Sequence, residues 1–206
     1  EAFQETNTTN NYTAIEPNII ETAFHQLAGM FDSQHGGFGK EPKFPSPLQL
    51  LFLMMYYHET NEDDALHMVE ITLDGIARGG ISDHLGGGFA RYSTDEMWLT
   101  PHFEKMLYDQ ALLLMAYTEA YQITRMPQYE EVVYNTVKFV EREMTHPEGP
   151  FYSAIDADSE GEEGTYYVWS FQEVIQVLGE DEGTLFARSY DITEEGNFDR
   201  KNIPNL

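Results

Sequence analysis

A glycine–aromatic motif recurs three times along this chain, each time between an amphipathic segment and a more apolar one. Its copies are Gly36-Gly37-Phe38, Gly87-Gly88-Phe89 and Gly149-Pro150-Phe151. Helical hairpins that stack into an array repeat in this way, because each hairpin buries its apolar face only against its neighbours. In a plain helical bundle each motif would be a glycine that ends a helix, but helix ends do not account for the long loop that follows each copy. The repeat therefore favours an array of αα-hairpins.

Apolar residues recur at helical spacing in seven segments that flank these loops. We expect helices from Pro17 to about residue 33 and over residues 46–60, 62–78, 102–124, 128–144, 170–178 and 182–189. The segment 46–60 is apolar on nearly every side, so we expect protein all around it. Two β-favouring runs, 151–154 and 165–169, flank an acidic turn and predict a β-hairpin.

These elements predict an all-α fold: a partial (α/α)6 toroid of about three helical hairpins, with short β-hairpins in its loops. Residues 1–14 are polar and rich in Asn and Thr, so we expect a flexible arm there. Residues 15–206 then form one incomplete domain, the N-terminal half of the toroid. The chain begins at Glu1 without a methionine, which suggests a piece excised from a longer product.

The composition excludes several classes of function. The 206 residues carry a formal net charge of -25 at pH 7, which repels nucleic acid and anionic membrane surfaces. Cysteine is absent, so these residues hold no disulfide, thiol nucleophile or cysteine-ligated zinc. No apolar run reaches the length of a membrane span. We expect a cytoplasmic protein without a cofactor, whose partner is a carbohydrate or another small polar ligand.

The densest group of chemically active side chains lies between residues 83 and 109. On a helix that starts at Pro101, the residues His102, Lys105 and Asp109 would share one face. That face continues into leucines, as expected for an inner helix whose first turns line a pocket while the rest is buried. The alternative is an ion pair between Lys105 and Asp109 on a solvated face, which contributes only about 0.3–0.5 kcal/mol.

Acid, base and hydroxyl-binding groups surround this helix start. A lone histidine is more often a structural hydrogen-bonding group, so the prediction depends on the whole cluster and not on His84 or His102 alone. Trp98 stands among polar loop residues and is the best candidate for an aromatic contact, although most aromatic side chains of such a chain belong to the core. The predicted substrate contacts are Asp83, Phe89, Arg91, Tyr92, Trp98, Glu104 and Lys105.

The acidic segment 156–164 begins like a calcium-binding loop, with oxygen-bearing side chains at positions 1, 3 and 5 and glycine at position 6. Position 12 is Tyr167 instead of a carboxylate, so the calcium pattern fails and we predict no metal site. Asp156 and Asp158 would point the same way on a strand and could serve acid–base chemistry on a sugar. A solvated acidic turn is the alternative.

Several long motifs resemble one protein family. GGFGKEPKFPSP, LGGGFARYSTD, PHFEKMLYDQA and DADSEGEEGTYYVW are similar, in this order, to the helical portion of the YyaL and spermatogenesis-associated protein 20 family. The resemblance implies a six-hairpin α/α toroid joined to a thioredoxin-like domain, whose paired cysteines this chain lacks. The family's motifs correspond here to Gly86–Phe89, His102–Met106 and Asp156–Glu160. That toroid is similar to N-acylglucosamine 2-epimerases and six-hairpin glycosidases, which implies a carbohydrate pocket at the N-termini of the inner helices.

Two hypotheses for the function follow, and a third possibility is that this incomplete piece has no activity of its own. The first is a fragment of a carbohydrate-active-enzyme-like domain with an epimerase-like or glycosidase-like pocket, whose reaction is left open. Its predicted catalytic groups are His84, His102, Asp109, Asp156 and Asp158. The second is a non-catalytic module that binds a glycan or a peptide and partners the thioredoxin-like domain. Half a toroid would also leave apolar helix faces partly uncovered, in particular over residues 48–55, which predicts self-association or partial disorder.

Overall fold

The computed structural model describes residues 18–206, and the predicted arm over residues 1–14 lies outside that range. Seven helices make up about half of the described chain. They are α1 (Ile19–Met30), α2 (Pro47–Thr60), α3 (Asp63–Arg78), α4 (Leu107–Thr124), α5 (Pro127–Glu143), α6 (Phe171–Leu178) and α7 (Glu180–Ser189). The predicted all-α class is confirmed, and every predicted helix except the one that becomes α4 begins and ends within a few residues of its expected bounds.

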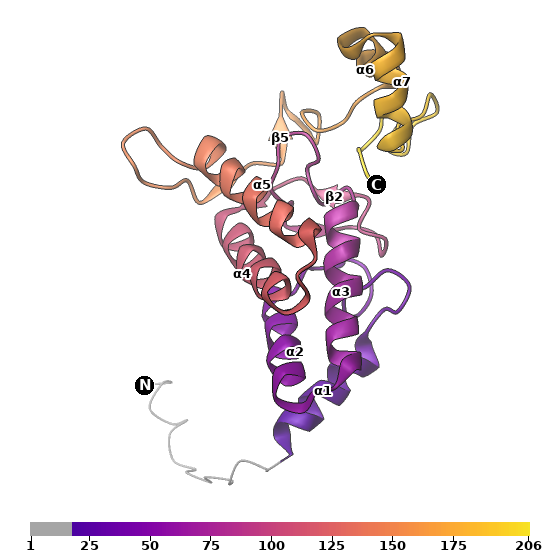
Figure 1. The fold of residues 1–206 in the computed structure, drawn as a ribbon. Coiled ribbons are helices and arrows are strands. Elements are labelled where there is room, and N and C mark those ends of the chain that lie inside the picture. Colours follow the sequence, from indigo (N-terminus) through magenta and orange to yellow (C-terminus); the bar gives the residue numbers. More distant parts are fainter. Residues whose placement is uncertain (1–17) are drawn as a thin grey trace, which may run out of the picture.

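Consecutive helices pair into three hairpins, α2–α3, α4–α5 and α6–α7. Helix α2 also packs along α4, so the first two hairpins lie side by side. Helix α1 contacts both α2 and α3. Figure 1 shows these five helices as one body, with the α6–α7 hairpin standing apart at the upper right and joined to it by loops. At that junction the backbone N–H of Leu206 donates to the carbonyl oxygen of Arg78, 2.8 Å away at the end of α3. The three hairpins of the predicted partial toroid are present.

Local sequence explains where several helices begin and end. Pro47 and Pro127 occupy the first turns of α2 and α5, where proline lacks only an N–H that the helix does not use. Asn61 and Arg125 end α2 and α4 in the left-handed conformation, with φ angles of 57° and 59°. Ser170 starts α6 with a capping box, in which its hydroxyl accepts from the backbone N–H three residues later.

Residues 101–106 form short strands and are not helical as predicted. Strand β2 (Pro101–His102) pairs with β1 (Tyr92–Ser93), and β3 (Lys105–Met106) pairs with β4 (Ala154–Ile155) from the third loop. The prediction that His102, Lys105 and Asp109 share one helix face is therefore wrong, because α4 begins only at Leu107. Backbone pairing with distant loops decides the conformation of this segment, and the spacing of its polar residues carries no sign of that pairing.

The β-hairpin predicted between residues 151–154 and 165–169 is also wrong. A hairpin forms inside the acidic segment instead, between β5 (Asp158–Ser159) and β6 (Glu162–Glu163). The run before α6 does make a strand-like contact, but its Trp169 pairs with Asn202 near the end of the chain. A run of β-favouring residues predicts an extended conformation, but it does not predict which other segment will pair with that run.

A repeated backbone contact links each loop to the next one. The contacting residues are Lys43 with Ser93, Lys105 with Ile155, and Trp169 with Asn202. In each pair the second residue lies four positions after a phenylalanine of the glycine–aromatic motif. The last pair reveals a fourth copy of this motif, Gly196-Asn197-Phe198, that the sequence analysis missed.

The main core lies between α2, α3 and α4. Leu50, Leu73 and Leu113 are fully buried there, and burial of each such side chain contributes about 1.5–3 kcal/mol. The outer side of α2 is different, because Leu48 and Met55 are 64% and 69% exposed. The expectation of protein on every side of this helix is wrong for that face, and the expectation of an uncovered apolar face over residues 48–55 is met.

Within residues 18–206 no helix is long and apolar enough to cross a membrane. The cytoplasmic location and the exclusion of nucleic-acid partners, both expected from composition, stay predictions.

Candidate functional site

The predicted site residues do not meet in one hollow. Two of them lie in the core, three lie around a cavity between the loops, two lie in the acidic segment, and five surround the start of α4. The core pair is Phe89 and Trp98, the cavity group is Asp83, His84 and Lys105, the acidic pair is Asp156 and Asp158, and the helix-start group is Arg91, Tyr92, His102, Glu104 and Asp109. The expectation of a single shared site is therefore wrong, and each group has its own surroundings.

Phe89 and Trp98 are core residues and not substrate contacts. Trp98 is fully buried, and its indole N–H donates to the carbonyl oxygen of His35 at 2.8 Å. Phe89 is 2% exposed and stacks on Tyr117 with ring centroids 5.8 Å apart. Neither ring presents a face to a ligand, so these two predicted contacts are corrected to structural positions.

Lys105 and Asp83 form a buried ion pair, and Lys43 and Asp32 form an equivalent pair in the first loop. The Lys105 ammonium group donates to Asp83 Oδ2 at 2.7 Å and to the carbonyl oxygen of Gly87 at 2.8 Å. Lys43 donates in the same way to Asp32 Oδ2 at 2.6 Å and to the corresponding glycine carbonyl at 2.8 Å. Burial lowers the pKa of Lys105, and the neighbouring Asp83 opposes that shift. Because the pair recurs at the same place in the repeat, it favours a structural role over the predicted substrate contact.

His84 is held at the C-terminus of α3. Its Nε2 lies 3.2 Å from the carbonyl oxygens of both Arg78 and Gly79, and its ring packs against Tyr190. Burial lowers its pKa, and the two carbonyl contacts and Asp83 oppose that shift in part. The neutral imidazole therefore closes a helix end with Nε2–H, a structural use that competes with the predicted catalytic one.

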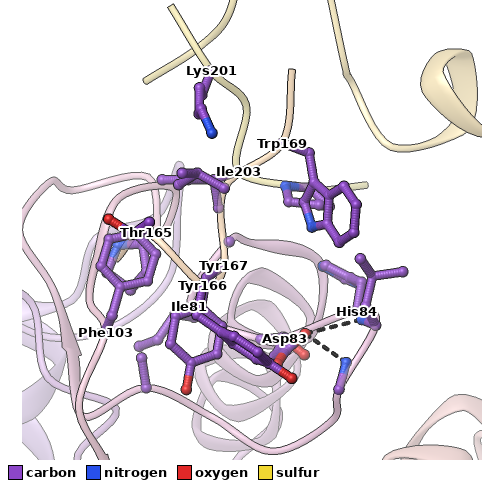
Figure 2. A pocket seen from close by; sticks show the side chains of 18 of the residues that line it. Ile81, Asp83, His84, Phe103, Thr165, Tyr166, Tyr167, Trp169, Lys201 and Ile203 are labelled. Atoms are coloured by element: carbon purple, nitrogen blue, oxygen red, sulfur yellow. Dashed lines mark hydrogen bonds between the residues drawn. The ribbon is translucent and has the colours of Figure 1, made fainter. Parts of the chain in front are cut away.

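A cavity of about 740 Å³ lies between the second, third and fourth loops. Figure 2 shows Phe103 and Thr165 on one side of it and Trp169 and His84 on the other. Lys105 also lines the cavity; its ammonium group lies 4.9 Å from the centre of the Tyr167 ring and is already bonded to Asp83. These two charged groups are thus bonded to each other, and the rest of the lining mixes aromatic, aliphatic and polar side chains.

The acidic pair lies outside this cavity. Asp156 and Asp158 are both exposed, and Asp156 Oδ1 accepts the backbone N–H of Asp158 at 3.1 Å. This local bond makes the segment a solvated turn, which was the alternative to a pair of catalytic carboxylates. Across residues 18–206 no group of three or more acidic, histidine or cysteine side chains is arranged to hold a metal ion.

The remaining residues form a surface that we call the Tyr92 patch. It consists of Phe44, Arg91, Tyr92, His102, Glu104, Asp109 and Glu163. The β1–β2 pairing sets Tyr92 opposite His102, and their rings stack with centroids 5.1 Å apart. Phe44 from the first loop lies 4.8 Å from the Tyr92 ring. Beside them the Arg91 guanidinium binds Glu104 Oε2 at 3.1 Å.

Asp109 is the strongest acid–base candidate of the patch. It lies in the first turn of α4, and burial raises its pKa to about 6, with Arg91 opposing the shift and Glu104 adding to it. Its buried Oδ2 has no hydrogen-bond partner within the described part of the protein. A carboxyl group that titrates near neutral pH can take up or release a proton there.

Phe44 and Glu163 are the patch residues that the sequence analysis missed, and Glu163 is the one that contacts a predicted catalytic residue. Its Oε1 lies 2.7 Å from His102 Nδ1, although the two residues belong to different loops. The prediction named Asp156 and Asp158 in the acidic segment instead, because residues two apart on a strand point the same way. In the sequence, the glycine that follows Glu163 is the feature that could have indicated this residue. Gly164 has a φ of 76°, and glycine favours such a tight turn.

Comparison with known proteins finds close relatives in animals. Spermatogenesis-associated protein 20 of Homo sapiens is 44% identical over 90% of this chain and 26% of that protein. An uncharacterized protein of Caenorhabditis elegans is 36% identical over 91% of this chain and 28% of its own length. The chain thus spans about a quarter of the length of the curated relatives that it matches. No family model matches it.

Solved structures of toroidal sugar enzymes share the fold. Cellobiose 2-epimerase from Bacillus thermoamylovorans matches 84% of this chain and 55% of its own chain at 14% identity, with a TM-score of 0.59. A D-mannose isomerase matches 87% of this chain and 50% of its own at 14% identity, with a TM-score of 0.56. Likeness at this identity establishes the fold alone, which is that of an α/α toroid.

Proposed function

We propose that this chain, which belongs to the spermatogenesis-associated protein 20 family, binds a carbohydrate or a similar polyhydroxylated ligand at the Tyr92 patch. The observation that carries the proposal is the buried, unpartnered Oδ2 of Asp109 at the start of an inner helix. A buried oxygen without a hydrogen bond costs free energy, and a ligand hydroxyl that reaches it once the covering side chains move aside would satisfy it. The fold likeness to a cellobiose 2-epimerase and a mannose isomerase supports a sugar as the ligand.

Each group of the patch has a chemical role in this proposal. Asp109 is the acid–base group, because a pKa of about 6 lets it hold or release a proton near neutral pH. Arg91 and Glu104, whose side chains are 41% and 28% exposed, donate to and accept from ligand hydroxyls. His102 is the second proton-transfer group, and the half-buried Tyr92 ring borders the ligand.

A second candidate is a recognition module that binds without chemistry. The cavity between the loops favours it, because the ammonium group of Lys105 and the carboxylate of Asp83 in its lining are bonded to each other. Aromatic and aliphatic side chains such as Trp169 and Ile203 also line the cavity, and they suit contact with an apolar ligand or a peptide side chain more than acid–base catalysis.

Nuclear magnetic resonance of the isotope-labelled chain tests the two candidates together. We expect monosaccharides and disaccharides at about 10 mM, enough to occupy a site with a Kd of about 1 mM, to shift the signals of Tyr92, His102 and Asp109. Tyr92→Ala should abolish these shifts. Tyr134→Ala is the matched control, because Tyr134 is 60% exposed and lies outside both the patch and the cavity. Shifts confined to Trp169 and the cavity, or no shift with any sugar, would overturn the carbohydrate proposal for the patch.

Self-association stays a separate prediction, independent of ligand binding. The exposed side chains of Leu48 and Met55 on α2 form an apolar face of the kind that contacts another copy or another hairpin. Sedimentation velocity should show a concentration-dependent dimer, which Leu48→Glu weakens. A strictly monomeric chain would contradict it without affecting the ligand proposal.

A further inference from the structure

The acidic hairpin β5–β6 delivers one side chain to the Tyr92 patch. Glu163 is the last residue of β6, and its Oε1 lies 2.7 Å from Nδ1 of His102 on β2. The two side chains are 48% and 32% exposed, so water reaches both of them. The exposed acidic residues Glu160 and Glu162 of the same hairpin make no such contact with the patch.

Adjacent residues fix this contact in place. Gly164 follows Glu163 and is buried, and a Cβ at this position would overlap the ring of Phe103, the neighbour of His102. The Gly164 backbone N–H donates to the carbonyl oxygen of Ala157 at 2.9 Å, which closes the base of the hairpin. Gly164 therefore packs on the Phe103 ring while the adjacent Glu163 contacts the adjacent His102. Close packing of the glycine holds the Glu163 carboxylate opposite the His102 imidazole.

This arrangement determines which imidazole nitrogen carries the proton. An ionised carboxylate only accepts hydrogen bonds, so Nδ1 of His102 must donate to Glu163. In a neutral imidazole the other nitrogen, Nε2, is then the free acceptor. The Tyr92 ring stacked on His102 limits rotation of the imidazole away from this position.

We propose that Glu163 is a positioning residue, which holds His102 in the Nδ1–H form and so presents Nε2 as the proton acceptor of the Tyr92 patch. This inference rests on the proposed function of the patch, and it adds to that function the acidic hairpin as the element that completes the site. A ligand hydroxyl that donates to Nε2 binds best when this form is already selected, because no free energy is spent on changing the tautomer.

Long-range proton–nitrogen spectra of the His102 ring, recorded at a pH at which the imidazole is neutral, test directly whether Glu163 holds it in the Nδ1–H form. We expect a protonated Nδ1 and an unprotonated Nε2 in the unchanged chain. Glu163→Ala should shift the ring toward the Nε2–H form, and Glu163→Gln, which keeps an acceptor oxygen, should restore part of the original spectrum. Glu162→Ala is the matched control on the same strand and should change nothing. An Nε2–H form in the unchanged chain, or an unaltered spectrum in Glu163→Ala, would overturn the proposal.

Titration with the sugar that binds the patch separates this inference from the proposed function. Glu163→Ala should weaken binding by about tenfold, which corresponds to about 1.4 kcal/mol, while Glu162→Ala binds as the unchanged chain does. A tautomer change with undiminished affinity would refute the role of Glu163 in ligand binding. If no sugar binds the unchanged chain, the proposed function fails, and the Nδ1–H spectrum alone still decides whether Glu163 positions His102.

Discussion

Lys43 and Lys105 occupy the same place in two successive loops, and each buried ammonium group binds the aspartate and a glycine carbonyl of its own loop. Both aspartates also accept two backbone N–H groups of the turn that precedes the glycine–aromatic motif. The pair therefore joins three parts of a loop: the turn, the motif and the segment before the inner helix. The resulting geometry fixes the backbone from which the Tyr92 patch is built.

Removal of either lysine should cost a large part of the stability. The side chain of Lys43 is fully buried, so Lys43→Met leaves the Asp32 carboxylate without its cation and should lower the free energy of unfolding by about 3 kcal/mol. Lys105→Met should cost a similar amount. Lys40→Met, at an exposed position of the same loop, should change stability by less than about 0.5 kcal/mol. Urea denaturation measures all three variants, and equal stability of Lys43→Met and Lys40→Met would contradict the structural role.

Gly88 should not tolerate a side chain. Its φ is 76°, and a Cβ there would overlap the ring of Phe139 on α5. Gly88→Ala combines backbone strain with overpacking and should cost about 2–4 kcal/mol. Gly29 is the control, because it lies inside α1 with nothing within 4 Å of a new Cβ. There alanine should stabilise the protein by about 0.5–1 kcal/mol, and thermal unfolding of the two variants should move in opposite directions.

Sequence patterns predicted the helices well because helical periodicity is a local property. The segment before α4 was mispredicted because its conformation is decided by pairing of β3 with β4, residues about fifty positions apart in the chain. The prediction that Trp98 is a ligand contact failed because a distant residue decides its position. Its polar neighbours in sequence suggested exposure, whereas its indole ring packs against Gly75 of α3. The contact between Glu163 and His102 joins two loops and has no local signature at all.

Substitution of Trp98 should affect mainly stability, and substitution of Tyr92 should affect mainly sugar binding. Trp98 is fully buried, so Trp98→Ala should lower the free energy of unfolding by about 3–5 kcal/mol. Tyr92 is half-buried at the surface patch, and Tyr92→Ala should cost less than about 1.5 kcal/mol while it abolishes sugar binding. Denaturation and sugar titration of both variants provide the check. If Trp98→Phe stayed stable and lost sugar binding, Trp98 would be a ligand contact after all.

The pH dependence of stability should report on Asp109. The pKa of its carboxyl group rises from 3.8 to about 6 because burial penalises the charged form, so the folded protein binds this proton more tightly than the unfolded chain does. Stability should therefore fall as the pH rises from about 4 to above 6. Asp109→Asn removes this penalty and should raise the free energy of unfolding by about 1 kcal/mol at about pH 8, a value reduced for partial solvent exposure. At about pH 4 it should have little effect.

The exposed Asp158 offers the matched control for that measurement. Asp158→Asn should change stability by less than about 0.5 kcal/mol at either pH, because water already solvates this carboxylate. A larger loss of stability in Asp109→Asn than in Asp158→Asn at high pH would mean that the Asp109 carboxylate makes a stabilising bond. That result would remove the free Oδ2 on which ligand recognition by the Tyr92 patch depends. For Asp109→Asn we expect higher stability together with lost sugar binding. A binding site keeps a polar group whose hydrogen bonds the folded protein alone does not satisfy, at a cost to stability.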